Sequence, residues 1–332
     1  MLGLAQDCIF KLQEAEKLYT QGLIEEIPEL LDSCIQKGFS KDEKLQALKL
    51  IILAHLFDDN LEEADNKMYN FLRLYPEYEI TPADPAEFVQ LFESYNVLPR
   101  FSVGVHMGTS LSLIQVLEPF GTHNLYNSER KYSFTGVPLT VGVNLHRLLF
   151  DNFELNLEMN FSTCKFEYNN ENYSGFGNIN YNESQSRIDM PLSCTYDIGN
   201  KRIKPYLRLG IGGGYLIESS TKSILQYLDG SHDDRKGENI VRTDNRNVFT
   251  LWGIVGTGLK YKLPKGYILA DVRYNQSLIN QVKPEYRYKS NNSSYSENDF
   301  TWFYFLTDEN FLMNNISFSV GYVRLLYKPR KK

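Results

Sequence analysis

The stretch Phe153-Glu154-Leu155-Asn156-Leu157-Glu158-Met159-Asn160-Phe161 decides the fold, because every odd position is apolar and every even position is polar or charged. A β-strand sends successive side chains to opposite faces, so this segment has one apolar face and one polar face. In a membrane barrel the apolar face contacts lipid and the polar face points inward. The pattern therefore favours a membrane-spanning strand.

Further segments share this strand pattern and bring the expected number of strands to about eight. Together with 152–168 they are 100–116, 132–147, 184–197, 203–218, 247–263, 266–278 and 311–327. The connections near 148–151, 197–202 and 263–266 are short, whereas those at 118–131, 169–183, 219–246 and 279–310 are long and polar. Outer-membrane barrels alternate tight periplasmic turns with longer outer loops in this way. We expect an antiparallel up-and-down transmembrane β-barrel whose ends both lie in the periplasm.

The two faces of these strands can be assigned from their alternation. The predicted lipid-facing side chains are Phe153, Leu155, Leu157, Met159, Phe161, Ile316, Phe318, Val320 and Tyr322. The predicted interior charge network is Glu154, Glu158, Arg187, Asp189, Arg208, Asp271 and Arg273. A barrel of about eight strands is only wide enough for its own side chains, so we expect buried ion pairs and no wide pore. A soluble lipocalin-like barrel remains the alternative, disfavoured because acidic and basic residues share one face.

Composition narrows the class of protein. The 332 residues carry a formal net charge of −6, which gives no electrostatic support to a nucleic-acid partner. Mean hydropathy is −0.38, and no run of about 18 apolar residues predicts a membrane-spanning helix. Aromatic residues make up 14% of the chain, which suits the girdles of a membrane barrel and equally an aromatic-rich β-sandwich.

Residues 8–96 show helical spacing instead of strand alternation. Ser40 with Glu43 fits a capping box, and Asn60 is placed to cap the following helix. An offset of about 37 residues relates the two hairpins weakly, as in tetratricopeptide (TPR) arrays, which present a groove to a peptide or partner. The sequence therefore predicts a TPR-like periplasmic domain, with a plain helical bundle as the alternative.

Two of the four cysteines lie in this helical region. Cys8 opens the first predicted helix and Cys34 closes the second, so an antiparallel hairpin would bring them side by side. A disulfide there would need an oxidising compartment, which fits the periplasm. Two buried thiols in contact are the alternative. Cys164 and Cys194 are expected on opposite faces of their strands, unpaired.

The chain ends are assigned separately from these domains. Residues 1–7 resemble the end of a signal peptide, with cleavage near Ala5 or Gln6, or a disordered start. The barrel domain is expected at 97–328 and a basic tail at 329–332. The tail either keeps the chain end soluble or contacts acidic periplasmic surfaces.

The sequence contains only weak motifs for phosphate binding or catalysis. Gly210-Ile211-Gly212-Gly213-Gly214 has the glycine content of a phosphate loop but lies within a strand pattern. Ser231, His232 and Asp233 have the residue types of a hydrolase triad, but consecutive residues rarely face one another. We expect no enzyme, no cofactor and no metal site. The Asn- and Tyr-rich loops 169–182 and 290–299 suit either adhesion or simple solvation.

The chain resembles the Bacteroidetes-type outer-membrane β-barrel family, which includes porin-family and PorT-like proteins. Phe101–Val105, Pro205–Gly212 and Phe318–Tyr322 carry the resemblance in the barrel. Asp7-Cys8, Ser33-Cys34-Ile35 and Tyr75-Pro76-Glu77-Tyr78, with Asp84–Phe88, resemble periplasmic segments that precede such barrels. The resemblance implies a non-enzymatic protein of the bacterial outer membrane, in some members serving secretion or envelope assembly.

These observations predict a barrel in outer-membrane lipid that anchors a periplasmic helical domain. That domain would bind a periplasmic or outer-membrane protein, as an accessory of a secretion, uptake or barrel-assembly complex. A narrow porin-like channel and a surface adhesin acting through the long loops are the alternatives.

Overall fold

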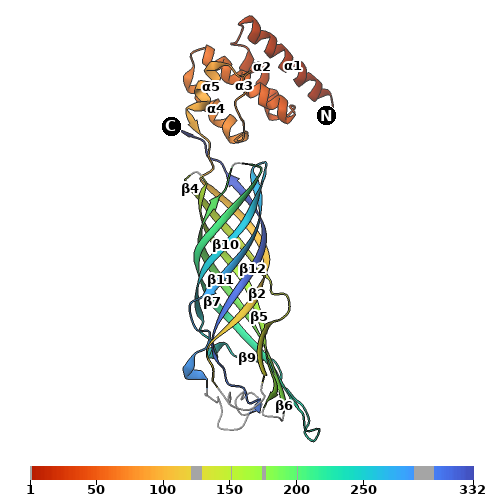
Figure 1. The fold of residues 1–332 in the computed structure, drawn as a ribbon. Coiled ribbons are helices and arrows are strands. Elements are labelled where there is room, and N and C mark those ends of the chain that lie inside the picture. The colour runs from red at the N-terminus through yellow and green to blue at the C-terminus, as the bar shows by residue number, and fades with distance from the viewer. Residues whose placement is uncertain (1, 121–128, 151, 174–176, 200, 288–302) are drawn as a thin grey trace. The chain divides into compact units, whose positions relative to one another are not determined.

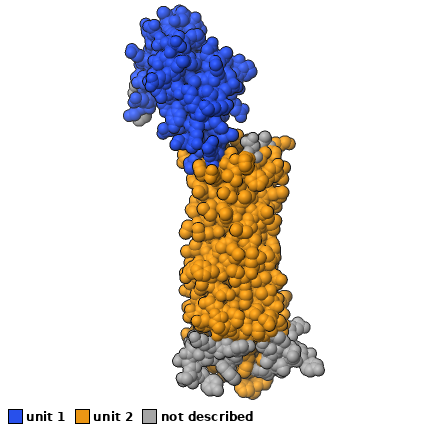
Figure 2. Space-filling model, turned by 90° about the vertical axis from the view of Figure 1, so that its left-hand side faces the viewer, with its two compact units in different colours: residues 1–100, 326–332 blue, residues 101–325 orange. Residues whose placement is uncertain are grey.

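The computed structural model describes residues 2–120, 129–150, 152–173, 177–199, 201–287 and 303–332. It contains two compact units, coloured separately in Figure 2. A helical unit comprises residues 1–100 and 326–332, and a barrel unit comprises Phe101–Leu325. The last seven residues therefore belong with the helices, although the sequence had suggested a separate tail from 329.

Five helices form the helical unit. They are α1 (Leu2–Gln21), α2 (Ile27–Gln36), α3 (Lys41–Phe57), α4 (Leu61–Leu74) and α5 (Ala86–Glu93). One apolar core lies between α1, α2 and α3 and includes Ala15, Leu31 and Ile51. A second lies between α3, α4 and α5 and includes Met68 and Phe88. None of the described helices is long and apolar enough to cross a membrane.

Local capping fixes where the helices begin. The Ser40 side chain accepts a hydrogen bond from the Glu43 amide, and the Glu43 carboxylate accepts one from the Ser40 amide, so the predicted capping box is confirmed. Asn60 caps α4 by accepting from the Glu63 amide. Helix α1 already starts at Leu2, so residues 2–7, expected as a leader remnant or disordered start, are helical.

The basic tail is ordered as a short strand. Strand β13 (Arg330–Lys331) pairs antiparallel with β1 (Tyr95–Asn96), and the Lys331 amine lies 2.7 Å from the Asp65 carboxylate on α4. The Lys332 amide also donates to the Ser94 carbonyl at 2.8 Å. The tail is thus part of the helical unit of its own chain, through strand pairing and the contact with Asp65.

Among the described residues, eight strands form the closed ring of the barrel (Figure 1). In ring order they are β2 (Phe101–Glu118), β4 (Thr140–Phe150), β5 (Phe153–Tyr173), β6 (Gly177–Asp197), β7 (Ile203–Tyr227), β10 (Phe249–Leu263), β11 (Gly266–Ser277) and β12 (Asn310–Leu326). Three short strands add to its loop end: β3 (Glu129–Phe134) pairs with β5, while β8 (Arg235–Lys236) and β9 (Ile240–Val241) pair with β7. Two short 3-10 turns, η1 (Thr243–Asn245) and η2 (Pro284–Tyr286), lie in the long connections. The expected antiparallel barrel of about eight strands is confirmed.

Two strand boundaries were predicted wrongly. The segment 132–147 is not one strand but two, β3 and β4, interrupted where Gly136 adopts a positive φ of 67° and Pro138 offers no amide donor. The segment 169–183, expected as a long polar loop, is mostly strand, because β5 and β6 pair as far as Tyr173 and Gly177. The other loop considered for adhesion, 290–299, lies outside the described residues.

The polarity of the strands inverts part of the way along the barrel. In β5 the outward side chains are apolar up to Phe161 and polar from Thr163 onward, while the inward side chains change from polar to aromatic. Phe166 and Tyr168 pack inward with Tyr181 in a core at the loop end. The strands therefore continue beyond the apolar belt as an extension that has its own core.

Candidate functional site: the filled interior of the barrel

The predicted lipid-facing side chains lie on the outer surface. Leu155 and Ile316 are partly exposed, and the others, Phe153, Leu157, Met159, Phe161, Phe318, Val320 and Tyr322, are exposed. Together with the outward residues of the neighbouring strands they form a continuous apolar belt. Such a belt is the surface that a membrane barrel presents to lipid.

Four of the predicted interior charges meet in one cluster, here called the central quartet: Glu158, Asp271, Arg208 and Arg273. Glu158 lies 2.8 Å from the Arg208 guanidinium and 2.6 Å from that of Arg273. Asp271 lies 3.1 Å from Arg208 and 2.9 Å from Arg273. All four side chains are almost fully buried, and two positive charges balance two negative ones. Pairing of this kind is what makes buried charges tolerable.

A second cluster fills the barrel near its short turns. The Lys260 amine lies 2.7 Å from the carboxylates of both Glu154 and Asp197. It also lies over the rings of Tyr206 and Tyr267, at 5.3 and 5.2 Å. Glu154 was predicted as an interior residue, whereas Lys260 and Asp197 were missed, although both have the inward parity of their strands.

A third cluster, here called the outer quartet, closes the loop end: Glu183, Asp308, Arg242 and Arg246. The Arg246 guanidinium lies 2.5 Å from Glu183 and 3.1 Å from Asp308, and Arg242 lies 2.7 Å from Asp308. Arg246 is only 1% exposed. This cluster was not predicted because three of its members come from long connections, whose residues Arg242, Arg246 and Asp308 lie in the barrel mouth.

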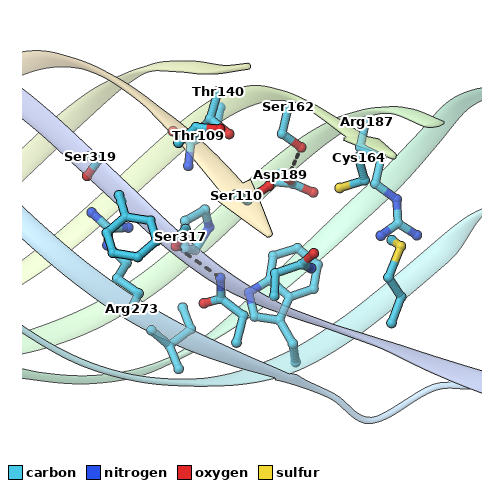
Figure 3. Close-up of a pocket in the computed structure, with 18 of the residues that line it drawn as sticks. Thr109, Ser110, Thr140, Ser162, Cys164, Arg187, Asp189, Arg273, Ser317 and Ser319 are labelled. Atoms are coloured by element: carbon cyan, nitrogen blue, oxygen red, sulfur yellow. Dashed lines mark hydrogen bonds between the residues drawn. The ribbon is translucent and has the colours of Figure 1, made fainter. Parts of the chain in front are cut away.

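A small polar cavity of about 80 Å³ remains in the interior (Figure 3). Asp189 accepts a hydrogen bond from Ser162 there, and Arg187 donates to Gln281 at 2.8 Å. These two predicted network residues thus line the same cavity but form no ion pair with each other. A cavity of this volume with polar walls can hold water molecules.

The residues considered for catalysis do not form a relay. His232 Nδ1 lies 2.5 Å from Asp229, not from Asp233, and the Ser231 hydroxyl lies 3.4 Å from the same nitrogen. Serine and carboxylate thus compete for one nitrogen, whereas a triad needs them on opposite sides of the ring. Hydrogen bonds from Ser231 and His232 lower the pKa of Asp229 to about 2. No cluster of metal-ligand side chains occurs in the described part of the chain.

A family model described as "Outer membrane protein beta-barrel domain" matches residues 88–283, which is more than half of the chain. Among solved structures, the chain is similar to Neisserial surface protein A (12% identity, 68% of this chain and 97% of that chain, TM-score 0.32). It is also similar to OprG from Pseudomonas aeruginosa (11% identity, 72% and 99%, TM-score 0.31) and to the outer membrane protease OmpT from Escherichia coli (8% identity, 70% and 98%, TM-score 0.36). No curated protein sequence matches the chain.

Proposed function

Because this chain belongs to the outer membrane protein β-barrel domain family, we propose that it is a non-enzymatic anchor whose closed barrel holds a helical interaction domain in the periplasm. The family supports a location in the bacterial outer membrane, where the apolar belt contacts lipid. We further propose that the barrel conducts no solute and that the helical unit binds another protein.

The filled interior is the observation that carries the proposal. The Lys260 cluster, the central quartet and the outer quartet follow one another along the barrel, and each places buried, paired side chains across a lumen of eight strands. Opening a path would require separating buried ion pairs, which is costly. This supports an anchor over a narrow porin-like channel.

We expect the full-length protein to give no conductance steps in a planar lipid bilayer. The same sample should show a mobility shift between unheated and boiled gel lanes, which establishes that the barrel is folded. Reproducible unitary conductance from protein that shows the shift would contradict the closed-barrel proposal and favour the channel.

The helical unit is proposed to lie in the periplasm. Strand β2 begins and β12 ends at the barrel end that carries the short turns. Short turns of outer-membrane barrels face the periplasm, so both chain connections would emerge there. The Cys8–Cys34 disulfide in α1 and α2 supports this side, because periplasmic proteins keep such bonds oxidised.

The packing of the helices supports a TPR-like interaction domain. Consecutive helices contact each other, and α1 contacts α3 while α3 contacts α5, as in stacked helical repeats. At the α1–α2 and α3–α4 turns, Leu23, Phe57 and Leu61 are more than half exposed. In this proposal, these side chains belong to the surface that contacts another protein. The proposed partner is a component of a secretion, uptake or barrel-assembly complex.

We expect a photo-crosslinking residue placed at Phe57 or Leu61 in the full-length protein to give a discrete adduct in cells. The matched control is the same residue at Asn66, which is also exposed on α4. Equal adducts from all three positions, or none from positions 57 and 61, would contradict a binding surface at these turns.

A further inference from the structure

The basic tail lies on the helical unit in the manner of a bound peptide. Its residues 327–332 run beside α4, where Figure 1 marks the end of the chain. The Tyr327 hydroxyl donates to the Glu77 carboxylate at 3.4 Å, beyond the end of α4, and the Lys331 amine contacts Asp65 near its start at 2.7 Å. The tail therefore runs antiparallel to α4 along most of that helix.

Main-chain contacts hold the same segment in a fixed register. Strand β13 adds to the edge of β1, so that Lys331 lies opposite Tyr95, and the Lys332 amide donates to the Ser94 carbonyl at 2.8 Å. Tyr95 itself is buried, and its hydroxyl donates to the Asp65 carbonyl at 3.3 Å. The edge of β1 thus accepts one added strand, which is a common way for a domain to bind an extended peptide.

The charges of the two surfaces are complementary. Residues 1–100 contain 19 acidic and 9 basic side chains, whereas residues 327–332 contain four basic side chains and no acidic one. Opposite charges across an interface favour one class of partner and disfavour others. The tail itself therefore shows which ligand this face of the helical unit accepts, namely an extended chain with positive charge.

The contacts of the tail are few and exposed. Only two of its residues pair as a strand, and the side chains of Lys331 and Asp65 are 57% and 30% exposed. Exposed ion pairs contribute little to stability, and short exposed segments open locally at little cost. A second ligand that makes more contacts with the same face can therefore displace the tail.

The apolar side chains at the α3–α4 turn continue the path of the tail. Leu61 lies one helical turn before Asp65 on the same face of α4 and is 61% exposed, and Phe57 precedes it at the turn. A helical turn rises about 5.4 Å, which an extended chain covers in about two residues. A peptide that followed the tail and continued would pass from Asp65 to Leu61.

We propose that this face of α4 and β1 binds an extended segment of a partner protein, in which basic residues are followed by an apolar residue, and that the tail competes for part of the same site. The proposal rests on the proposed function, because it gives the chemistry of the partner of the helical unit. A segment tethered by a short linker competes at an effective concentration in the millimolar range. The tail therefore excludes weak ligands and yields to a segment that also contacts Leu61.

The test titrates two fluorescent peptides against the full-length protein in detergent and against two tail variants. The first peptide copies residues 327–332, and the second adds Leu-Phe to its end. One variant lacks residues 327–332, and the other, K331E, keeps the whole tail but loses its ion pair with Asp65. We expect saturable binding of both peptides to the shortened variant and about tenfold weaker binding to the wild type, where the tail competes. K331E should lie between the two.

Matched substitutions in the shortened variant locate the peptide. D65N should weaken both peptides by about two- to fivefold, whereas D32N, which removes an exposed acidic charge from α2, should not. The peptide that ends in Leu-Phe should bind more tightly than the first, and L61N should remove this gain. A retained gel mobility shift and unchanged helical circular dichroism establish that each variant is folded.

Absence of saturable binding to both tail variants would overturn the proposal. Equal affinity of the wild type and the shortened variant would overturn it too, because the tail would then not occupy the peptide site. Equal weakening by D32N and D65N, or equal binding of hexalysine, would show attraction by total charge only and would also overturn it. None of these outcomes alters the adducts expected at positions 57 and 61, so a failure here is distinguishable from a failure of the proposed function.

Discussion

Replacing Glu158 by glutamine should lower the free energy of unfolding of the barrel by about 3 to 5 kcal/mol, because removing one member of a buried ion pair leaves the opposite charge unpaired. Glu158 contacts both Arg208 and Arg273, at 2.8 and 2.6 Å, and without its charge Asp271 alone would face two guanidinium groups. Glutamine has nearly the same volume as glutamate, so the variant leaves no cavity. The lost free energy of unfolding therefore comes from the missing charge. The measurement is urea unfolding of the full-length protein in detergent, followed by the gel mobility of unheated samples.

The control is Glu171→Gln, which makes the same change in the same strand at an exposed position. Surface substitutions of this kind stay within about 0.5 kcal/mol of the wild type. If E158Q unfolded at the same urea concentration as E171Q, the central quartet would contribute no stability, and the closed-barrel proposal would lose its main support.

A second variant separates charge balance from the loss of one hydrogen bond. In E158Q/R273Q one positive and one negative charge are removed together, and Asp271 keeps its 3.1 Å contact with Arg208. We expect this double variant to be more stable than E158Q alone, because no buried charge is left over. Simple additivity of the two losses would contradict the balanced-quartet interpretation.

The alternation in 153–161 places Glu158 and Met159 on opposite faces, because parity fixes the face of every residue in a regular strand. That Glu158 is the inward one was inferred from the acidic and basic residues that share its face and from the alternating loop lengths. The same argument was not carried into residues 169–183, which follow the predicted strand 152–168. Parity continues along the β5–β6 hairpin, with Phe166, Tyr168 and Tyr181 all directed inward, but the outward face has become polar and rich in asparagine. Asparagine has low strand propensity, so the sequence suggested a loop, and the aromatic core that stabilises the hairpin was missed.

The outer quartet could not be predicted for a different reason. Arg242, Arg246 and Asp308 belong to connections without regular alternation, so no parity relates them to Glu183 on β6. They meet only because the described parts of these connections fold back into the barrel mouth, where Arg246 bonds to both carboxylates. The alternation of side chains within one strand does not predict contacts with residues of an irregular connection. The β13 strand was missed likewise, because two residues are too few for a pattern.

Replacing both Cys8 and Cys34 by serine should lower the free energy of unfolding of the helical unit by about 3 kcal/mol, because the cross-link closes a loop that is otherwise free in the unfolded chain. The disulfide joins residues 26 positions apart, with Cα atoms 5.6 Å apart, and both side chains are buried. Gly38 packs directly on it: a Cβ there would lie 2.5 Å from Cys8 Sγ. For a unit of this size, about 3 kcal/mol corresponds to a drop in Tm of more than 10 °C.

The measurement is the thermal loss of helical circular dichroism in the full-length protein, in which the barrel strands remain folded and contribute a constant background. The matched control is C164S/C194S, which removes the two cysteines that form no disulfide and should leave the helical transition unchanged. Adding a reductant to the wild type should reproduce the C8S/C34S transition. If reduced and oxidised wild type melted together while C8S/C34S melted lower, the loss would come from packing of the sulfur atoms and not from the cross-link.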